Sequence, residues 1–257
     1  MSGPARLDLI GLPGLPVVQP GDDLAALIAD ALGRAQLELR RQDVLVVAQK
    51  IVSKAEDRAV DLATVEPSAA ARALAAEVVK DPRLVEVILS ESHRVVRKRE
   101  NVLITEHRLG FVMANAGVDH SNVGPSAGPE RVLMLPLDPD GSAERLRAGL
   151  AARYGCALAV IINDSFGRPW RRGTAGVALG AAGLPALRDL RGRPDLFGRP
   201  LEVTMVGFAD EIAAAASLVM GQAGEALPVV LVRGLSWDEA ESRAQELIRA
   251  AHEDLFR

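Results

Sequence analysis

The chain has 257 residues, of which 49% are hydrophobic, 25% charged and 3% aromatic, with a formal net charge of −4. This composition predicts one soluble globular unit over residues 1–257, in which two lobes are allowed but no separable extra domain is expected. It argues against a nucleic-acid-binding protein and against a membrane protein, because there is no basic excess and no long apolar run. The lone Cys156 excludes a disulfide within the chain, and with no signal peptide at the N-terminus we expect a cytoplasmic protein.

The first expected elements are a short strand over residues 7–12 and a helix that begins after Asp23. Between them, two Gly-Leu-Pro units at 11–16 predict a stiff, exposed turn whose backbone amides can face a ligand. A plain connection between strand and helix explains the same residues, and the alternative stays open.

A β-branched run predicts a buried strand over residues 43–48, and a polar turn follows it at 49–56. Polar groups directly after a buried strand are typical of active-site edges in α/β structures. Lys50 and Lys54 could each bind phosphate in this turn, although a single lysine is more often a surface residue.

The next segment predicts two helices, over residues 67–80 and 84–89, and then a basic patch at 93–99. Two strands, 102–105 and 109–114, are expected to form a hairpin. Further on, we predict a strand over 131–135 and a helix that Ser142 caps and that ends near Tyr154.

Residues 115–124 concentrate Asn, Asp, His and Ser between two glycines. The carboxylate of Asp119, with hydroxyl and amide neighbours, suits a hard divalent cation and the phosphate bound to it. His120 would instead suggest a transition metal, but one histidine without a nearby cysteine argues against a structural zinc site.

An apolar strand over residues 158–162 is expected to stop at Asp164, followed by the Ser165 hydroxyl and by Arg168, Arg171 and Arg172. A carboxylate and a hydroxyl at a strand end can hold a divalent cation, and arginines can hold phosphate. The window 166–199 carries a local charge of +5, from seven Arg and two Asp. The alternatives are a strand followed by an ordinary polar turn, and a solvated basic face.

The Gly- and Ala-rich stretch 173–183 is expected to allow close backbone approach. Strands are predicted over 201–208 and 228–232, and helices from Ala209 to about Met220 and from Ser236 through Leu255. Asp210 and Glu211 suit a first helical turn, which leaves a role as general base open. Residues 221–224 fit either a glycine C-cap or a nucleotide-binding loop.

Six stretches, taken together and in order, resemble the coenzyme F420-0:L-glutamate ligase family over nearly the whole chain. They are Gly14-Leu15-Pro16 with Gly21-Asp22-Asp23-Leu24, Val52-Ser53-Lys54-Ala55-Glu56, Ala116-Gly117-Val118-Asp119 with Ser121-Asn122-Val123, Leu137-Asp138-Pro139-Asp140-Gly141-Ser142-Ala143, Asp164-Ser165 with Gly167-Arg168 and Arg171, and Ala209-Asp210-Glu211-Ile212-Ala213. Each stretch is weak alone, and the matching order and spacing carry the signal.

The resemblance implies an α+β fold of mixed β-sheets with flanking helices, distinct from P-loop, Rossmann and ATP-grasp folds, in a homodimer. It implies a GTP-dependent ligase of coenzyme F420 biosynthesis whose substrates are GTP, L-glutamate and F420-0. The enzyme would join glutamate in amide linkage to the phospholactyl carboxylate through an acyl phosphate, and could extend the product with γ-linked glutamates. Transfer of a γ-phosphoryl group needs cations and positive side chains more than covalent catalysis.

The family's metal ligands fall on Asp119, Asp164 and Ser165, for two divalent cations, Mg or Mn, with room for a monovalent cation such as K⁺. Catalytic roles are implied for Asp119, Asp164 and Arg168. The implied GTP contacts are Leu15, Pro16, Val17, Val18, Gln49, Lys54 and Asn122, with Gly221 and Gln222 from the glycine loop.

The chain departs from the family at three positions. Ser165 stands where threonine is usual, which keeps the hydroxyl; Gln49 stands where serine is usual, and Asn163 where threonine is usual. These departures leave open another nucleotide, or another metal-dependent amide ligase or phosphotransferase with a different acceptor. A non-catalytic nucleotide-binding module is the third alternative.

Overall fold

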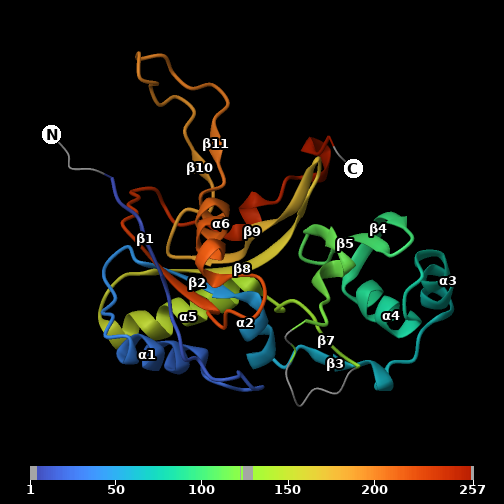
Figure 1. Cartoon of the computed structure of the whole chain (residues 1–257). Helices are drawn as coiled ribbons and strands as arrows, with labels where there is room; N and C mark the ends of the chain where they lie inside the picture. Colours follow the sequence, from blue (N-terminus) through green and yellow to red (C-terminus); the bar gives the residue numbers. More distant parts are fainter. Residues whose placement is uncertain (1–4, 122, 124–129, 256–257) are drawn as a thin grey trace.

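The protein is an α+β fold built around one five-stranded mixed sheet (Figure 1). The computed structural model describes residues 5–121, 123 and 130–255. The strand order is β1-β12-β2-β8-β9, in which β2 and β8 are parallel and the other neighbours antiparallel. The bounds are β1 Asp8–Gly11, β2 Val44–Ala48, β8 Ala159–Arg168, β9 Arg171–Ala182 and β12 Val229–Arg233. The predicted class, mixed sheets with flanking helices, is confirmed.

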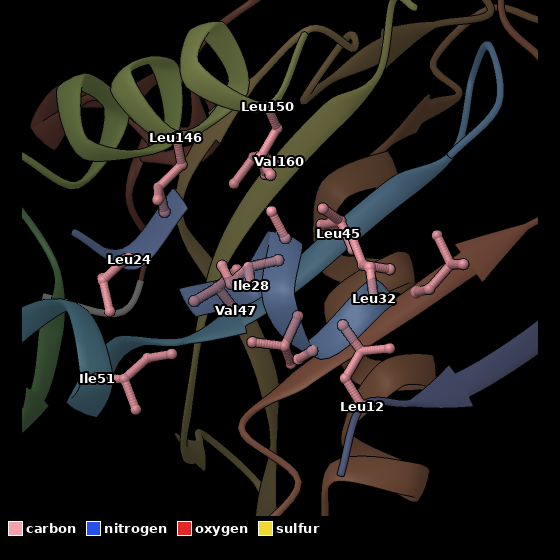
Figure 2. Close-up of a cluster of buried hydrophobic side chains, with 14 of the residues drawn as sticks. Leu12, Leu24, Ile28, Leu32, Leu45, Val47, Ile51, Leu146, Leu150 and Val160 are labelled. Atoms are coloured by element: carbon pink, nitrogen blue, oxygen red, sulfur yellow. The ribbon is translucent and has the colours of Figure 1, made fainter. Parts of the chain in front are cut away.

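Helices cover both faces of this sheet: α1 (Leu24–Arg34) and α5 (Pro139–Tyr154) lie on one face and α6 (Phe208–Met220) on the other. The period of two along β2 divides its side chains between the two cores. Leu45 and Val47 join the core under α1 and α5, while Val44 and Val46 join the core under α6. Figure 2 shows the first of these cores, with strand and helix side chains interleaved. The run is therefore apolar throughout because both faces are buried.

A smaller lobe lies beside the sheet, with its own hydrophobic core (Figure 1). Two helices pack there against a three-stranded antiparallel sheet of order β4-β5-β6, and a two-stranded pair, β3-β7, leads back to the main body. The elements are β3 Ala59–Asp61, η1 Leu62–Thr64, α3 Ala69–Val78, α4 Pro82–Ser90, β4 Ser92–Arg99, β5 Val102–His107, β6 Val112–Ala114, η2 Asn115–Gly117 and β7 Arg131–Leu133. The predicted basic patch at 93–99 is thus an edge strand, whose polar side chains are largely exposed.

The strand predicted over 158–162 is longer than expected, because β8 continues past Asp164 to Arg168 and forms a hairpin with β9, which was not predicted as a strand. The expected close approach in the Gly- and Ala-rich stretch is confirmed. A Cβ on Gly176 would lie 2.5 Å from the Ala213 carbonyl oxygen, and one on Gly180 would lie 2.2 Å from that of Pro139. Glycine at these positions lets β9 rest directly on the backbones of α5 and α6.

An arm formed around β10 (Arg188–Asp189) and β11 (Met205–Val206) projects from the main body (Figure 1). The strand predicted over 201–208 is therefore wrong except at residues 205–206. Residues 201–204 belong to the arm, where Leu196 and Phe197 are about nine-tenths exposed, at 92% and 88%. These apolar side chains have no core to join within the described residues.

Two further predictions need correction. Asp138, not Ser142, caps α5, because its carboxylate accepts the Gly141 amide at 3.0 Å. The terminal helix expected over 236–255 is absent from the described residues, which contain only the short turns η3 (Ala244–Leu247) and η4 (Ala251–Glu253) there. No described helix combines the length and apolarity needed to cross a bilayer.

Candidate functional site

A cavity of about 760 Å³ opens at the edge of the sheet where the parallel pairing of β2 with β8 ends. Ala48 and Asn163, which are paired in register at this edge, both line it. Crevices beyond the carboxyl ends of parallel strands are common ligand sites, because the chains diverge there into loops. Two such loops, residues 15–18 and 221–228, form part of the wall.

The structure brings most of the predicted site residues together on this cavity. The predicted site residues that line it are Leu15, Pro16, Val17, Val18, Gln49, Lys54, Asp119, Asp164, Ser165, Gly221 and Gln222. Arg168 is not among the lining residues, and Asn122 lies outside the described residues. The geometry groups these side chains but leaves their individual roles as predictions.

The predicted polar turn after β2 is in fact a helix, α2 (Gln49–Ala55). Ile51 and Val52 are buried in the core, which anchors one side of this helix. Lys50 and Lys54, four residues apart, both line the cavity. Partial burial, and then the charge of Lys50, lower the pKa of Lys54. This helix was not predicted from the sequence because its polar side faces an open cavity instead of solvent alone.

The backbone before Asp119 is held in an unusual conformation. Asn115, Ala116 and Gly117 have φ values of 53°, 51° and 69°, three consecutive residues in the left-handed region. A Cβ on Gly117 would lie 2.7 Å from the Leu135 side chain. Asp119 then pairs with Leu133, with backbone N–O distances of 3.0 and 2.8 Å. These contacts fix the carboxylate at the cavity wall.

The Asp119 carboxylate is surrounded by donors. Its Oδ2 lies 2.7 Å from Lys50 Nζ and accepts the Ser121 hydroxyl at 2.8 Å, while its Oδ1 accepts the Ser121 amide at 2.8 Å. Burial alone raises the pKa of Asp119, but the hydrogen bonds from Lys50 and Ser121 outweigh it and hold the pKa below its ordinary value. Asp119 is therefore an anion near neutral pH.

Asp164, on β8, is the second carboxylate of the cavity. Burial raises its pKa to about 6, and the negative charge of Asp119 acts in the same direction, while the Ser165 amide and the Lys50 charge oppose them. Beside it, the Ser165 hydroxyl donates to Gln222 Oε1 at 2.7 Å, which joins β8 to the loop after α6. Burial of this carboxylate thus outweighs the nearby charge of Lys50, and a bound cation would favour its ionised form.

The donors fit hard divalent cations. Asp119, Asp164, Ser165 and Gln222 offer carboxylate, hydroxyl and amide oxygens, the ligands that Mg²⁺ and Mn²⁺ prefer. The described residues contain no group of three or more His, Cys, Asp or Glu suited to a metal. The Lys50 ammonium, which sits among the oxygens of Asp119 and Ser121, already shows that this part of the site attracts a cation.

Gln49 and Asn163, two of the family departures, are buried amides in the cavity wall, 2% and 4% exposed. Ser217 Oγ gives its hydrogen to the Ala213 carbonyl, so it can only accept from Asn163 Nδ2, at 3.1 Å. This fixes the Asn163 amide and leaves its Oδ1 buried without a partner among the described residues. Gln49 Oε1 accepts the Ser53 hydroxyl at 2.9 Å.

The loop after α6 has the geometry of a glycine C-cap. Gly221, with φ 74°, donates its amide to Ser217 O at 3.1 Å, and a Cβ there would lie 2.1 Å from the Glu225 side chain. The same loop lines the cavity, so both alternatives drawn from its sequence describe the same residues.

The remaining candidates lie elsewhere. Arg168 is on the β8–β9 hairpin, with Nη1 buried and unpaired among the described residues. Asp210 accepts the Ala178 amide at 2.8 Å, and Glu211 is exposed; neither lines the cavity. Their place in the first turn of α6 therefore accounts for them, and the role of general base that the sequence left open gains no support.

The family resemblance assigned a GTP contact to Lys54 but no role to Lys50, and sequence reasoning did not single out Arg131; both Lys50 and Arg131 line the cavity. A helix assigned to residues 49–55 would have placed both lysines on one face. No local signal pointed to Arg131, because it enters the site only through the pairing of β7 with β3.

The chain matches the family model described as F420-0:Gamma-glutamyl ligase over residues 14–234. It is 47% identical over 253 residues to the coenzyme F420:L-glutamate ligase of Methanothermobacter thermautotrophicus, an alignment that covers 98% of this chain and 99% of the relative. It is 48% identical over 244 residues to the protein of the same name from Methanopyrus kandleri, covering 93% of each. The corresponding Methanocaldococcus jannaschii protein is 41% identical over 254 residues, covering 98% of this chain and 97% of the relative.

Proposed function

The chain belongs to the F420-0:gamma-glutamyl ligase family, and we propose that it joins L-glutamate to the phospholactyl carboxylate of F420-0 at the expense of GTP. The observation that carries the proposal is a cavity in which Asp119 and Asp164 meet Lys50 and Lys54 beside the loops at residues 15–18 and 221–228. Such a site can hold a nucleotide triphosphate with its cations and balance the charge of its phosphates.

The proposed reaction proceeds in two steps. A carboxylate oxygen of F420-0 attacks the γ-phosphorus of GTP, which breaks the bond to GDP and forms an acyl phosphate. The amine of glutamate then attacks the acyl carbon, releases phosphate and loses a proton, leaving an amide bond. Repetition on the γ-carboxylate of the added glutamate would extend the product by γ-linkage.

Each part of the cavity has a proposed task. Asp119, Asp164 and Ser165 hold two divalent cations, which when bound polarise the phosphoryl oxygens. Lys54 offsets phosphate charge, and the backbones of residues 15–18 and 221–222 bracket the nucleotide. A monovalent cation such as K⁺ and a homodimeric state, which follow from the family resemblance alone, belong to the same proposal, as does the cytoplasmic location expected from the sequence.

The second candidate is an amide ligase or phosphotransferase on the same scaffold with another nucleotide or acceptor. Gln49 and Asn163 favour it, because both are buried amides in the wall of the cavity and both depart from the family pattern. The amide side chains of Gln49 and Asn163 can both donate to and accept from a ligand that the usual serine and threonine hydroxyls would not reach.

Mass spectrometry of the product tests the proposal. The purified full-length chain, incubated with F420-0, L-glutamate, GTP and Mn²⁺, is expected to raise the substrate mass by whole glutamyl residues. Parallel reactions with ATP, with D-glutamate and without metal ion define the co-substrates. No mass shift with GTP, together with a shift for another acceptor acid, would favour the second candidate.

A further inference from the structure

Lys50 and Asp119 form the closest charge pair of the cavity, and Lys50 has a task that the family resemblance does not assign. Its Nζ lies 2.7 Å from Asp119 Oδ2, contacts the Ser121 hydroxyl, and lies 3.3 Å from the Ser121 carbonyl oxygen. A carboxylate, a hydroxyl and a carbonyl are the oxygen types that ligate a hard divalent cation. The ammonium therefore fills a nest built for a cation.

The pair is also balanced in charge. Asp119, Asp164 and Glu225 carry three negative charges when ionised, and Lys50, Lys54 and Arg131 carry three positive charges, so the cavity lining is close to neutral. Lys50 is about three-quarters covered, since its side chain is 25% exposed, which makes its attraction to Asp119 stronger than that of a surface pair. A divalent cation that approaches Asp119 meets an ammonium already in place.

We propose that Lys50 is a positioning residue that occupies the cation site of Asp119 in the nucleotide-free protein and gives up this carboxylate when a divalent cation binds. The inference rests on the proposed function for the identity of the nucleotide, but the competition itself needs no nucleotide. Once displaced, the ammonium stays on the cavity wall, where anionic phosphates become its next partner. This arrangement disfavours the binding of a divalent cation to Asp119 until phosphates are present to pair with the Lys50 ammonium.

Removal of an ordinary metal ligand weakens metal binding, whereas the proposed competition predicts that removal of the Lys50 ammonium strengthens it. Lys50→Met keeps the length of the side chain but removes the ammonium, so Mn²⁺ no longer has to displace a charge. We expect the nucleotide-free K50M protein to bind Mn²⁺ about tenfold or more tightly than the unaltered protein. The measurement is calorimetric titration of Mn²⁺ into full-length protein from which metal has been removed.

Lys54→Met is the matched control. It removes the same charge one turn further along α2, and within the described residues Lys54 forms no ion pair. Its effect on Mn²⁺ affinity should be about threefold or less, since only long-range charge is lost. Lys50→Arg, which keeps the charge, should bind Mn²⁺ as weakly as the unaltered protein.

Three results would overturn the inference: an unchanged Mn²⁺ affinity in K50M, a weaker one, or an equal gain in K54M. An equal gain would mean that net charge, not occupation of Asp119, sets the affinity. Lys50→Gln serves as a second neutral variant if K50M does not fold. The titration contains neither GTP nor F420-0, so failure to ligate glutamate leaves this test intact, and the converse also holds.

Discussion

Arg233 on β12 and Asp43 before β2 form a two-pronged ion pair at the end of the sheet opposite the cavity, with Nε–Oδ1 and Nη2–Oδ2 distances of 2.8 and 2.6 Å. Asp43 is 1% exposed and also accepts the Arg40 amide at 2.7 Å. The pair ties the antiparallel strand β12 to the start of the strand that leads into the site. Its geometry is the one in which arginine binds carboxylates most strongly.

Arg233→Met should therefore destabilise the fold, because it leaves the Asp43 carboxylate buried without its cation. We expect the free energy of unfolding to fall by about 3 kcal/mol, measured by urea denaturation. Arg191→Met removes a similar contact, with Asp189, from the exposed arm and should leave stability unchanged within error. Equal losses in the two variants would contradict the importance given to burial.

Asp164→Asn tests the second carboxylate of the cavity. It keeps the shape of the side chain but removes the charge that would hold a cation, so we expect turnover to fall by about a hundredfold or more while the fold is retained. Steady-state assays and circular dichroism measure the two effects. Asp195→Asn, an exposed change on the arm, is the control, and normal activity in D164N would rule out the metal role of Asp164.

Gly180→Ala tests the contact between β9 and the start of α5. The added Cβ would meet backbone atoms of Pro139, which cannot rotate away as a side chain does. The expected loss is about 2–3 kcal/mol in the free energy of unfolding. Gly167→Ala, on the same hairpin with no atom within 4 Å of the added Cβ, should change stability little. An equally stable G180A would mean that α5 can move away at low cost.

The Glu91 cluster predicts an acid-dependent stability. Burial alone raises the pKa of Glu91, but the nearby His107 ring and the charges of Arg58 and Arg108 outweigh it, so the net pKa lies below its ordinary value. His107 Nδ1 accepts the Leu109 amide at 2.9 Å, which turns Nε2 toward Glu91 at 3.4 Å.

A lowered folded-state pKa stabilises the protein above the unfolded pKa of about 4.3, and this stabilisation is lost as the pH falls through the folded value. Thermal melting between pH 7 and pH 3 should show the loss below about pH 5. Glu91→Gln should be less stable at pH 7 and lose less on acidification, whereas Glu100→Gln, an exposed control, should follow the unaltered protein. If E91Q lost as much thermal stability between pH 7 and pH 3 as the unaltered protein, Glu91 would be excluded as the source of the loss.

The strands β2 and β12 and the first half of β8 could be predicted from the sequence because they are continuous apolar runs with both faces buried, whereas the Gly- and Ala-rich β9 was not predicted as a strand. The cavity edge was predictable for a related reason: Gln49 and Asn163 are the first polar residues after such runs, and Asp164 follows Asn163 directly. Residues 49–55 were misassigned because the polar side chains that face the cavity hide the helical period of Ile51 and Val52.

The helix predicted for the C-terminal segment is wrong for a different reason. Residues 236–255 have the pattern of an amphipathic helix, but tertiary hydrogen bonds compete with it. Asp140 at the start of α5 accepts the amides of Ala244 and Gln245, and the Ser242 hydroxyl accepts the Ala186 amide at 3.0 Å. Long-range partners of this kind leave no trace in local periodicity.

Asp119 and Asp164 are carried by parts of the chain that belong to different hydrophobic cores. Asp164 follows Ile162 of the main sheet, whereas Asp119 follows Val118 of the smaller lobe. The two bodies meet through a separate apolar cluster that contains Phe111, Met113, Leu135 and Leu179. The spacing of these two proposed cation ligands therefore depends on how the two bodies pack against each other. Mutations in this apolar cluster would change the distance between the two carboxylates without altering any residue that lines the cavity.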